Sequence, residues 1–184
     1  MPLDVSQLHI RTYPDPVLRN KTAPIEKIDD TVRAVADRMI QLMREVNGAG
    51  LAAPQVGLDW QMFVVAAHAA APNDQQPDSD DEPHDQVFIS PLITPISRDL
   101  VAYEEGCLSL PGITAEVRRP SAVKITARTL DDQTITLESD DFPARVWQHE
   151  FDHLQGILII DRMSPLDRLA TRKTLKEMRA AAGQ

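Results

Sequence analysis

The segment His149–His153, with the sequence HEFDH, constrains this chain more than any other feature. On a helix, residues four apart lie on one face, so both imidazoles can reach a single metal ion. Glu150 lies one step along, where its carboxylate can face an open position of that ion. The pattern favours a metal-dependent hydrolase.

The residues around this segment predict the helix that the pattern needs. Asp140 or Asp141 can cap it, Pro143 suits its first turn, and Gly156 can end it. The same spacing also occurs on solvated helices that bind no metal. Here the neighbouring apolar residues indicate a largely buried helix, in which ionisable groups need a partner or a ligand. These neighbours are Val146, Trp147, Phe151 and Leu154.

Two histidines do not complete a catalytic site, which normally has three protein ligands and one position for water. The longer zinc-protease motif HExxHxxGxxH is matched through Gly156, but Ile159 stands where its third histidine should be. Glu177 is the only glutamate downstream, and it lies in a separate predicted helix. We therefore expect the third ligand to lie upstream.

Cys107, the only cysteine, is the upstream candidate. A lone cysteine is most often a small buried hydrophobe. Beside a site that lacks one ligand, however, a thiolate supplies the soft anionic donor that two histidines do not. We favour Cys107 as a ligand.

Three motifs together resemble those of peptide deformylases, in the order found in that family. They are GAGLAAPQ at 48–55, EGCLS at 105–109 and QHEFDHL at 148–154. The segments Leu8–Ile10 and Pro16–Arg19 also resemble the amino-terminal strand and turn of the family. The similarity covers nearly the whole chain and leaves out 66–86.

The resemblance implies that Cys107, His149 and His153 hold one metal ion, whose bound hydroxide attacks the formyl carbon at the amino terminus of a peptide. Glu150 would move the proton from that water to the departing amine. The side-chain amide of Gln55 and the backbone N–H of Leu108 would stabilise the negative oxygen that develops. Formate and a free amino terminus would be the products.

The same resemblance favours Fe(II) as the ion in the cell. Zinc, nickel and cobalt also tolerate a site of two histidines and one thiolate. A thiolate-bound ferrous ion is easily oxidised, so purified protein could carry another metal. Behind the site, Asp152 is expected to pair with Arg119.

The substrate implied by the resemblance is a nascent chain that begins with formyl-methionine. Arg145 and Val146 precede His149 by four and three residues, so they share its face of the helix. With Ala49 and Leu108 they could border a pocket for the methionine side chain. Gly50 would allow close approach of the peptide backbone. We expect Arg145 to stand at the pocket mouth with its charge in water.

Two alternatives belong to other functional classes. One is a structural metal module without turnover, but it would need neither a proton carrier at Glu150 nor an amide at Gln55. The other is a zinc aminopeptidase or protease, which Ile159 and a cysteine ligand disfavour. Release of formate from formyl-Met-Ala would distinguish all three.

Composition predicts one domain over 1–184, because 42% of the 184 residues are hydrophobic and can form one core. The resemblance implies that it is the catalytic domain. No apolar run is long enough to span a bilayer, and Met1–Asp4 has no leader character. We expect a bacterial cytoplasmic protein without a membrane partner. The net charge of −9 disfavours binding of free nucleic acid.

Hydrophobic periodicity predicts an α+β fold, with mixed or antiparallel sheets around the central metal-binding helix and a further helix at the carboxyl end. A first helix is capped by Asp29 or Asp30 and ends near Asn47-Gly48. Strands are expected at 62–65, 87–89, 122–130, 134–137 and 157–160. The stretch 66–86 is expected to be a mobile acidic surface loop, with His68 and His84 solvated.

The last helix, expected from Ser164 onward, is basic in an otherwise acidic chain. Its cations are Arg168, Arg172, Lys173, Lys176 and Arg179. They could simply complement the carboxyl end of the helix. By the resemblance, we expect the helix at 164–184 to dock on the ribosome.

Overall fold

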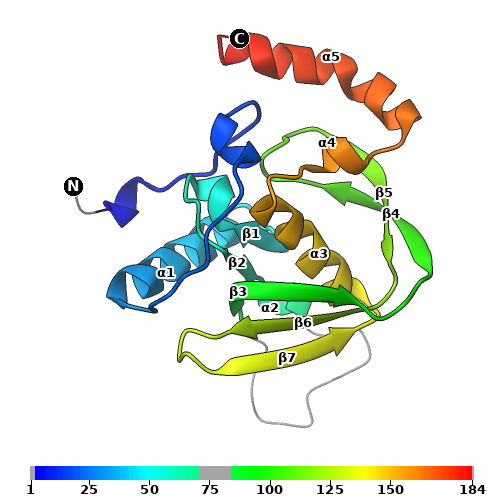
Figure 1. Cartoon of the computed structure of the whole chain (residues 1–184). Helices are drawn as coiled ribbons and strands as arrows, with labels where there is room; N and C mark the ends of the chain where they lie inside the picture. The colour runs from blue at the N-terminus through cyan, green and yellow to red at the C-terminus, as the bar shows by residue number, and fades with distance from the viewer. Residues whose placement is uncertain (1–2, 71–83, 184) are drawn as a thin grey trace.

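A central helix, α3 (Phe142–Leu154), is surrounded by the other elements of an α+β fold, as Figure 1 shows. The computed structural model describes residues 3–70 and 84–183. Within these ranges the sheet pairings of named strands are all antiparallel, which agrees with the predicted fold class. No helix there is long and apolar enough to cross a bilayer.

The larger sheet has five strands in the order β1-β2-β3-β6-β7. Their bounds are β1 (Gly50–Ala52), β2 (Met62–Val65), β3 (Gln86–Pro95), β6 (Val123–Arg128) and β7 (Thr134–Ser139). Phe63 pairs with Phe88 across β2 and β3. The predicted strands at 62–65, 87–89, 122–130 and 134–137 are confirmed as parts of this sheet.

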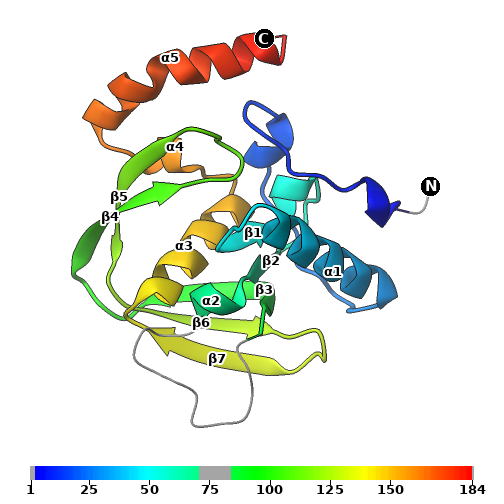
Figure 2. The ribbon, with the colours of Figure 1, turned by 180° about the vertical axis from the view of Figure 1, so that it is seen from behind.

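The smaller sheet is a ribbon of two strands, β4 (Leu100–Gly106) and β5 (Thr114–Pro120). The pairing runs from Leu100 opposite Pro120 to Gly106 opposite Thr114. Figures 1 and 2 show the ribbon curving past α3 on the side away from helix α1. Its last paired residue, Gly106, directly precedes Cys107, so the ribbon positions the thiol.

Local signals set the helix boundaries. Helix α1 (Asp30–Glu45) is capped by Asp29, whose carboxylate accepts a hydrogen bond from Val32 N at 3.1 Å. It ends at Glu45, and Asn47, two residues further on, adopts a left-handed conformation (φ 52°). Helix α3 is capped by Asp141, and Gly156 follows its end with a positive φ of 71°.

The buried hydrophobic residues form two clusters. The main cluster joins α1 and the larger sheet to α3 through Val146, Trp147 and Leu154. The second joins β5 to the amino-terminal segment, to the loop that precedes β5 and to the segment 158–163. Its buried members are Tyr13, Leu18, Leu110, Ile113, Ala115, Val117, Leu158, Ile159 and Met163, and Cys107 packs against them.

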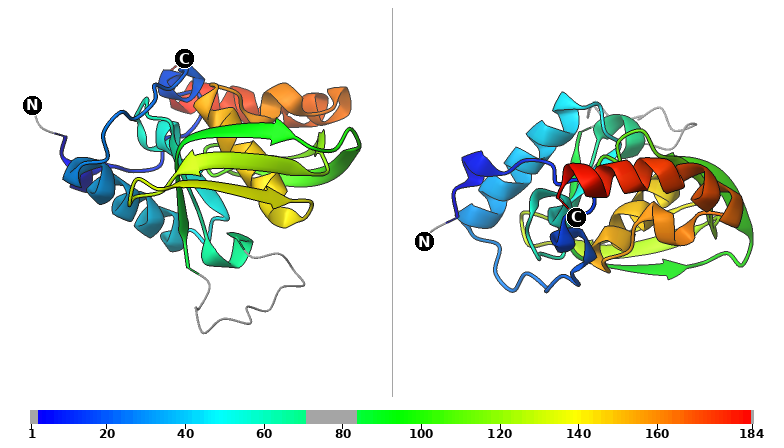
Figure 3. Two further views of the ribbon diagram at one scale, coloured as in Figure 1. Left: turned by 60° about the horizontal axis from the view of Figure 1, so that its bottom comes forward. Right: turned by 90° about the horizontal axis from the view of Figure 1, so that it is seen from above.

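The terminal helix α5 (Pro165–Ala181) begins as predicted, with Ser164 accepting a hydrogen bond from Asp167 N. It lies across the top of the molecule in Figure 1 and in front in the right-hand view of Figure 3. Leu175 and Met178 pack against the second cluster. The five cations of the helix are exposed.

Two predicted strands are wrong. The apolar run 157–160 leads into a short helix, α4 (Ile159–Arg162), because the Asp161 carboxylate accepts a hydrogen bond from Leu158 N at 2.8 Å. The segment Leu8–Ile10 forms no strand and lies between two 3-10 helices, Val5–Gln7 and Pro16–Arg19.

The predicted surface loop at 66–86 is wrong at its two ends. Ala66 and Ala69 are buried, and α2 (Ala67–Ala70) continues the packed structure. At the other end, β3 already begins at Gln86. His68 and His84 are exposed, as expected. The remainder, 71–83, lies outside the described residues.

Candidate metal centre and active site

Cys107, His149 and His153 come together between the smaller sheet and α3. One potential ligand atom from each lies within 4.8 Å of the others. Cys107 Sγ is 3.4 Å from His153 Nε2. The upstream cysteine therefore lies beside the two histidines, in an arrangement that could hold a metal ion.

The chemistry of these side chains fits a divalent transition metal. His149 Nδ1 is hydrogen-bonded to Glu105 Oε2 at 2.9 Å, which leaves the other ring nitrogen for a ligand role. Burial lowers the pKa of His153 well below its usual range, so its ring is neutral, the form that binds metals. A soft thiolate with two imidazoles suits iron, zinc, nickel or cobalt.

Glu150 is almost fully buried, with 4% of its surface exposed. Among the described residues, its Oε2 atom is buried and has no hydrogen-bond partner. Burial raises the pKa of Glu150 to about 7. A carboxyl group with this pKa can accept and return a proton near neutral pH.

Gln55 is held with a fixed side-chain orientation. Its Oε1 accepts a hydrogen bond from Ala52 N at 2.8 Å, so its amide nitrogen points the other way. That nitrogen lies 3.2 Å from Ser109 Oγ and 3.8 Å from Cys107 Sγ. The amide donor therefore faces the candidate ligands.

A cavity of about 530 Å³ opens beside this cluster. The predicted residues that line it are Ala49, Gly50, Gln55, Cys107, Leu108, Arg145, Val146, His149 and Glu150. His153 is fully packed and is not part of this lining. The structure thus brings all the predicted site residues into one region.

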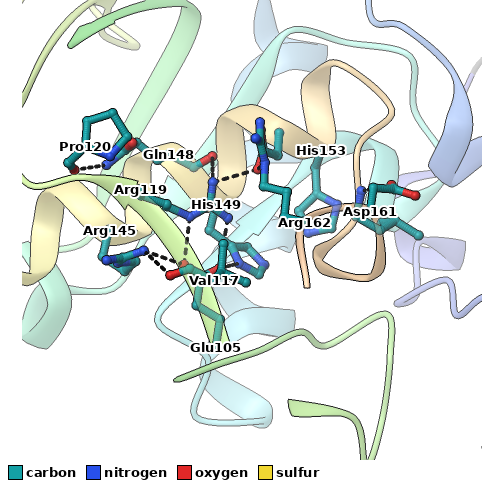
Figure 4. Close-up of polar contacts among 12 residues, drawn as sticks. Glu105, Val117, Arg119, Pro120, Arg145, Gln148, His149, His153, Asp161 and Arg162 are labelled. Atoms are coloured by element: carbon teal, nitrogen blue, oxygen red, sulfur yellow. Dashed lines mark hydrogen bonds and ion pairs between the residues drawn. The ribbon is translucent and has the colours of Figure 1, made fainter. Parts of the chain in front are cut away.

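Behind the cluster, a buried ionic network fixes the histidine helix, as Figure 4 shows. Arg119 donates to both oxygens of Glu105, at 2.7 and 2.8 Å, and to Asp152 at 2.7 Å. Burial alone would raise the pKa of Glu105, but hydrogen bonds from Arg119 and His149 lower it to about 2. Glu105 is therefore a permanently ionised acceptor for the His149 ring.

The predicted ion pair of Asp152 and Arg119 is present. Two further members of the ionic network were not predicted from the sequence. Arg162, from α4, makes a second ion pair with Asp152. Glu105 stands beside Cys107 in the sequence, but its role as the acceptor for His149 was missed. A glutamate two residues from a candidate ligand, in the same motif, was the signal that could have revealed it.

The expectation for the charge of Arg145 is wrong. Its guanidinium donates to Glu105 Oε1 at 3.1 Å, to the carbonyl of Val117 at 3.1 Å and to the carbonyl of Val101 at 2.8 Å. Only 12% of the side chain is exposed. The guanidinium group is bound by acceptors of the smaller sheet that lie within hydrogen-bonding distance, and it does not point into the solvent.

Comparison with known proteins agrees with this geometry. The family model described as polypeptide deformylase matches residues 7–169. The chain belongs to the polypeptide deformylase family. Members of this family remove the formyl group from nascent peptides, so the chain is a hydrolase that acts in protein biosynthesis, as the motifs predicted. The inert metal module and the zinc protease are not favoured.

Individual deformylases are similar over most of the chain. A peptide deformylase of Borreliella burgdorferi is 45% identical over 149 residues, which are 81% of this chain and 83% of that protein. The chloroplastic peptide deformylase 1B of Oryza sativa is 42% identical over 172 residues, and these cover 93% of this chain but 60% of the rice protein. The crystal structure of a plant deformylase superposes with a TM-score of 0.86 at 36% identity, covering 99% of this chain and 94% of that one.

Proposed function

We propose that Cys107, His149 and His153 hold one divalent metal ion in a deformylase active site, with Glu150 as the proton carrier. The observation that best supports this is the cluster of three ligand atoms beside a buried carboxylate that has an unpartnered oxygen. A divalent ion held there supplies Lewis acidity toward water and the formyl carbonyl.

The chain's own residues perform the remaining steps. Glu150 takes the proton from the attacking water and delivers it to the departing amine nitrogen. The Gln55 amide and the Leu108 N–H donate hydrogen bonds to the formyl oxygen as it becomes negative. Glu105 holds the His149 ring in one orientation throughout. The products are formate and a free amino terminus.

The first side chain of the substrate is methionine, held in the cavity of about 530 Å³. Ala49 and Val146 provide apolar walls, and Gly50 leaves room for the peptide backbone. An unbranched thioether adapts well to such a pocket.

The assay follows formate and free alanine separately after addition of formyl-Met-Ala. We expect formate together with intact Met-Ala, and no reaction with acetyl-Met-Ala, whose acyl group is larger. Free alanine and formyl-methionine without formate would indicate a peptidase, and no product with any divalent metal would indicate an inert module.

We propose Fe(II) as the ion in the cell, because the resemblance to the deformylase family favours it over zinc, nickel and cobalt, which the same ligand set also suits. Protein loaded anaerobically with Fe(II) should release formate much faster than protein loaded with zinc. Metal content must be matched before the rates are compared. Equal or faster turnover by the zinc form would contradict the proposal.

We propose further that the protein acts in the bacterial cytoplasm and binds the ribosome through α5. The exposed cations at Arg168, Arg172, Lys173 and Lys176 support an attraction to ribosomal RNA. The bacterial relative from Borreliella is consistent with this location, whereas the rice relative is described as chloroplastic.

A further inference from the structure

The two amide donors proposed for the formyl oxygen come from segments that are far apart in the chain. Gln55 lies in the 3-10 helix Ala53–Val56, and Leu108 lies in the loop that follows β4. Donors of this kind stabilise a developing negative charge only when both lie about 2.7–3.1 Å from the same oxygen. The relative position of the two segments therefore matters for the reaction.

The amino-terminal segment Arg11–Tyr13 connects these two segments through their main chains. Arg11 N donates to the carbonyl oxygen of Gln55 at 2.7 Å, and Tyr13 N donates to the carbonyl oxygen of Ser109 at 2.9 Å. Two residues span at most about 7 Å, so the two donors hold the carbonyl groups at a limited separation. Segment 11–13 is called the bridging segment below.

The carbonyl groups that accept these bonds belong to buried residues. Gln55 is 1% exposed and Ser109 is fully buried, so water cannot readily replace a lost donor. A side-chain bond from Gln55 Nε2 to Ser109 Oγ, at 3.2 Å, also joins the two segments. It occupies one of the two amide hydrogens, and the other must stay free for the formyl oxygen. The main-chain bonds restrain the same segments without using the amide at all.

The bridging segment is itself anchored at both ends. Tyr13 is buried in the second hydrophobic cluster, and its hydroxyl accepts a hydrogen bond from Arg179 of α5 at 2.6 Å. The Arg11 side chain lies against Gly57, where a β-carbon would be 3.2 Å from Arg11 Nε. Contacts with α5 and with the residue after the 3-10 helix therefore keep the segment in place.

We propose that the bridging segment positions the two oxyanion donors through its main-chain N–H groups. Arg11 acts on Gln55 directly, and Tyr13 acts on Leu108 through the carbonyl group of the next residue. Both are positioning residues, since neither lines the substrate cavity. This inference rests on the proposed function, which names the two donors.

The test replaces one backbone N–H by an ester oxygen and leaves the side chain unchanged. The α-hydroxy analogue of arginine at position 11 removes the donor to Gln55. The same change at Thr12 is the matched control, because within residues 3–70 and 84–183 the N–H of this exposed residue makes no hydrogen bond. With formyl-Met-Ala, the Arg11 ester should lower kcat about tenfold with little change in KM, since complete loss of an oxyanion donor costs about 100-fold to 1,000-fold. The Thr12 ester should keep the wild-type kcat.

A double substitution tests whether Arg11 acts through Gln55. In a Gln55→Ala background the Arg11 ester should change kcat little further, whereas a purely structural effect would lower kcat by the same factor in both backgrounds. Metal content and thermal unfolding are measured for every variant. If the Arg11 ester does not fold, the Tyr13 ester provides the test, because it removes the donor to Ser109. Its loss of kcat should persist in Gln55→Ala, since it acts through the other donor.

Equal kcat values for the Arg11 and Thr12 esters would overturn the inference. The same would follow if the Arg11 ester had an equal effect with and without the Gln55 amide, or if the Tyr13 ester kept the wild-type kcat. A wild type that releases no formate would contradict the proposed function, and this inference with it.

Discussion

Gly50 faces Glu150 so closely that a β-carbon at position 50 would lie 2.6 Å from Glu150 Oε1 and 2.8 Å from its Cγ. Real β-carbons do not approach heavy atoms to this distance. The glycine therefore provides the space in which the buried carboxylate lies. This adds a second role to the one inferred from the sequence, where Gly50 was expected to allow approach of the substrate backbone.

Gly50→Ala should displace the Glu150 carboxylate and lower kcat about 100-fold, since a shift of about 1 Å in a catalytic group has an effect of this size. Metal content should stay at the wild-type level, because the three heavy atoms nearest to the new methyl group all belong to Glu150 and none to a candidate ligand. Steady-state kinetics with formyl-Met-Ala and metal analysis check this. A raised KM with unchanged kcat would show that position 50 acts only through substrate contact.

Glu150→Gln should lower kcat by about 100-fold to 10,000-fold, because it deletes proton transfer and preserves the shape of the side chain. The fold and the bound metal should be retained, as checked by thermal unfolding and metal analysis. Removing a buried carboxyl with a raised pKa should not destabilise the protein at neutral pH. Near-normal turnover in this variant would remove Glu150 from the mechanism.

The buried pair of Arg119 and Asp152 should show strong energetic coupling. Arg119→Met leaves two buried carboxylates without their shared partner, which should cost about 3–5 kcal/mol of unfolding free energy. A double-mutant cycle with Asp152→Asn should give a coupling of about 1–3 kcal/mol. The exposed pair of Lys124 and Glu138, 2.7 Å apart, is the matched control and should couple by less than about 1 kcal/mol. Equal coupling in the two pairs would contradict this view of the network.

Ribosome binding should depend on the exposed cations of α5. Truncation after Pro165 would also remove Leu175 and Met178 from the second cluster, so a charge variant is the cleaner experiment. Replacement of Arg172, Lys173 and Lys176 by glutamine should weaken ribosome binding and reduce its salt dependence. Arg179 stays unchanged because it donates to Tyr13 Oη at 2.6 Å. Deformylation of a short peptide should be unaffected, and salt-independent or undiminished binding would refute the idea.

The sequence predicted those helices and strands whose boundaries are set by residues close to them in the chain. The cap at Asp141, the proline at 143 and the glycine at 156 define α3 within one short segment. Helix α1 and the strands of the larger sheet are marked equally clearly by apolar periodicity. The candidate site residues could also be found from the sequence, because they lie in or beside three short continuous motifs.

The β4–β5 ribbon was missed because its pattern contains a buried cation. In β5, Ala115, Val117 and Arg119 point inward in strict alternation. An arginine at an inward position breaks the apolar rule, and its partners, Glu105 and Asp152, are 14 and 33 residues away. The charge of Arg145 was misplaced for the same reason, since its acceptors lie on another element. Long-range ionic partners are not visible in a single sequence.

A bound metal would connect the two hydrophobic clusters, because its candidate ligands come from both. His149 and His153 belong to the helix that packs in the main cluster, whereas Cys107 packs against the second one. An ion bound by all three side chains would cross-link two separately packed parts of the chain. Supply of the metal would thereby govern whether the two parts unfold as one cooperative unit, so the protein's resistance to proteolysis would follow the metal status of the cell.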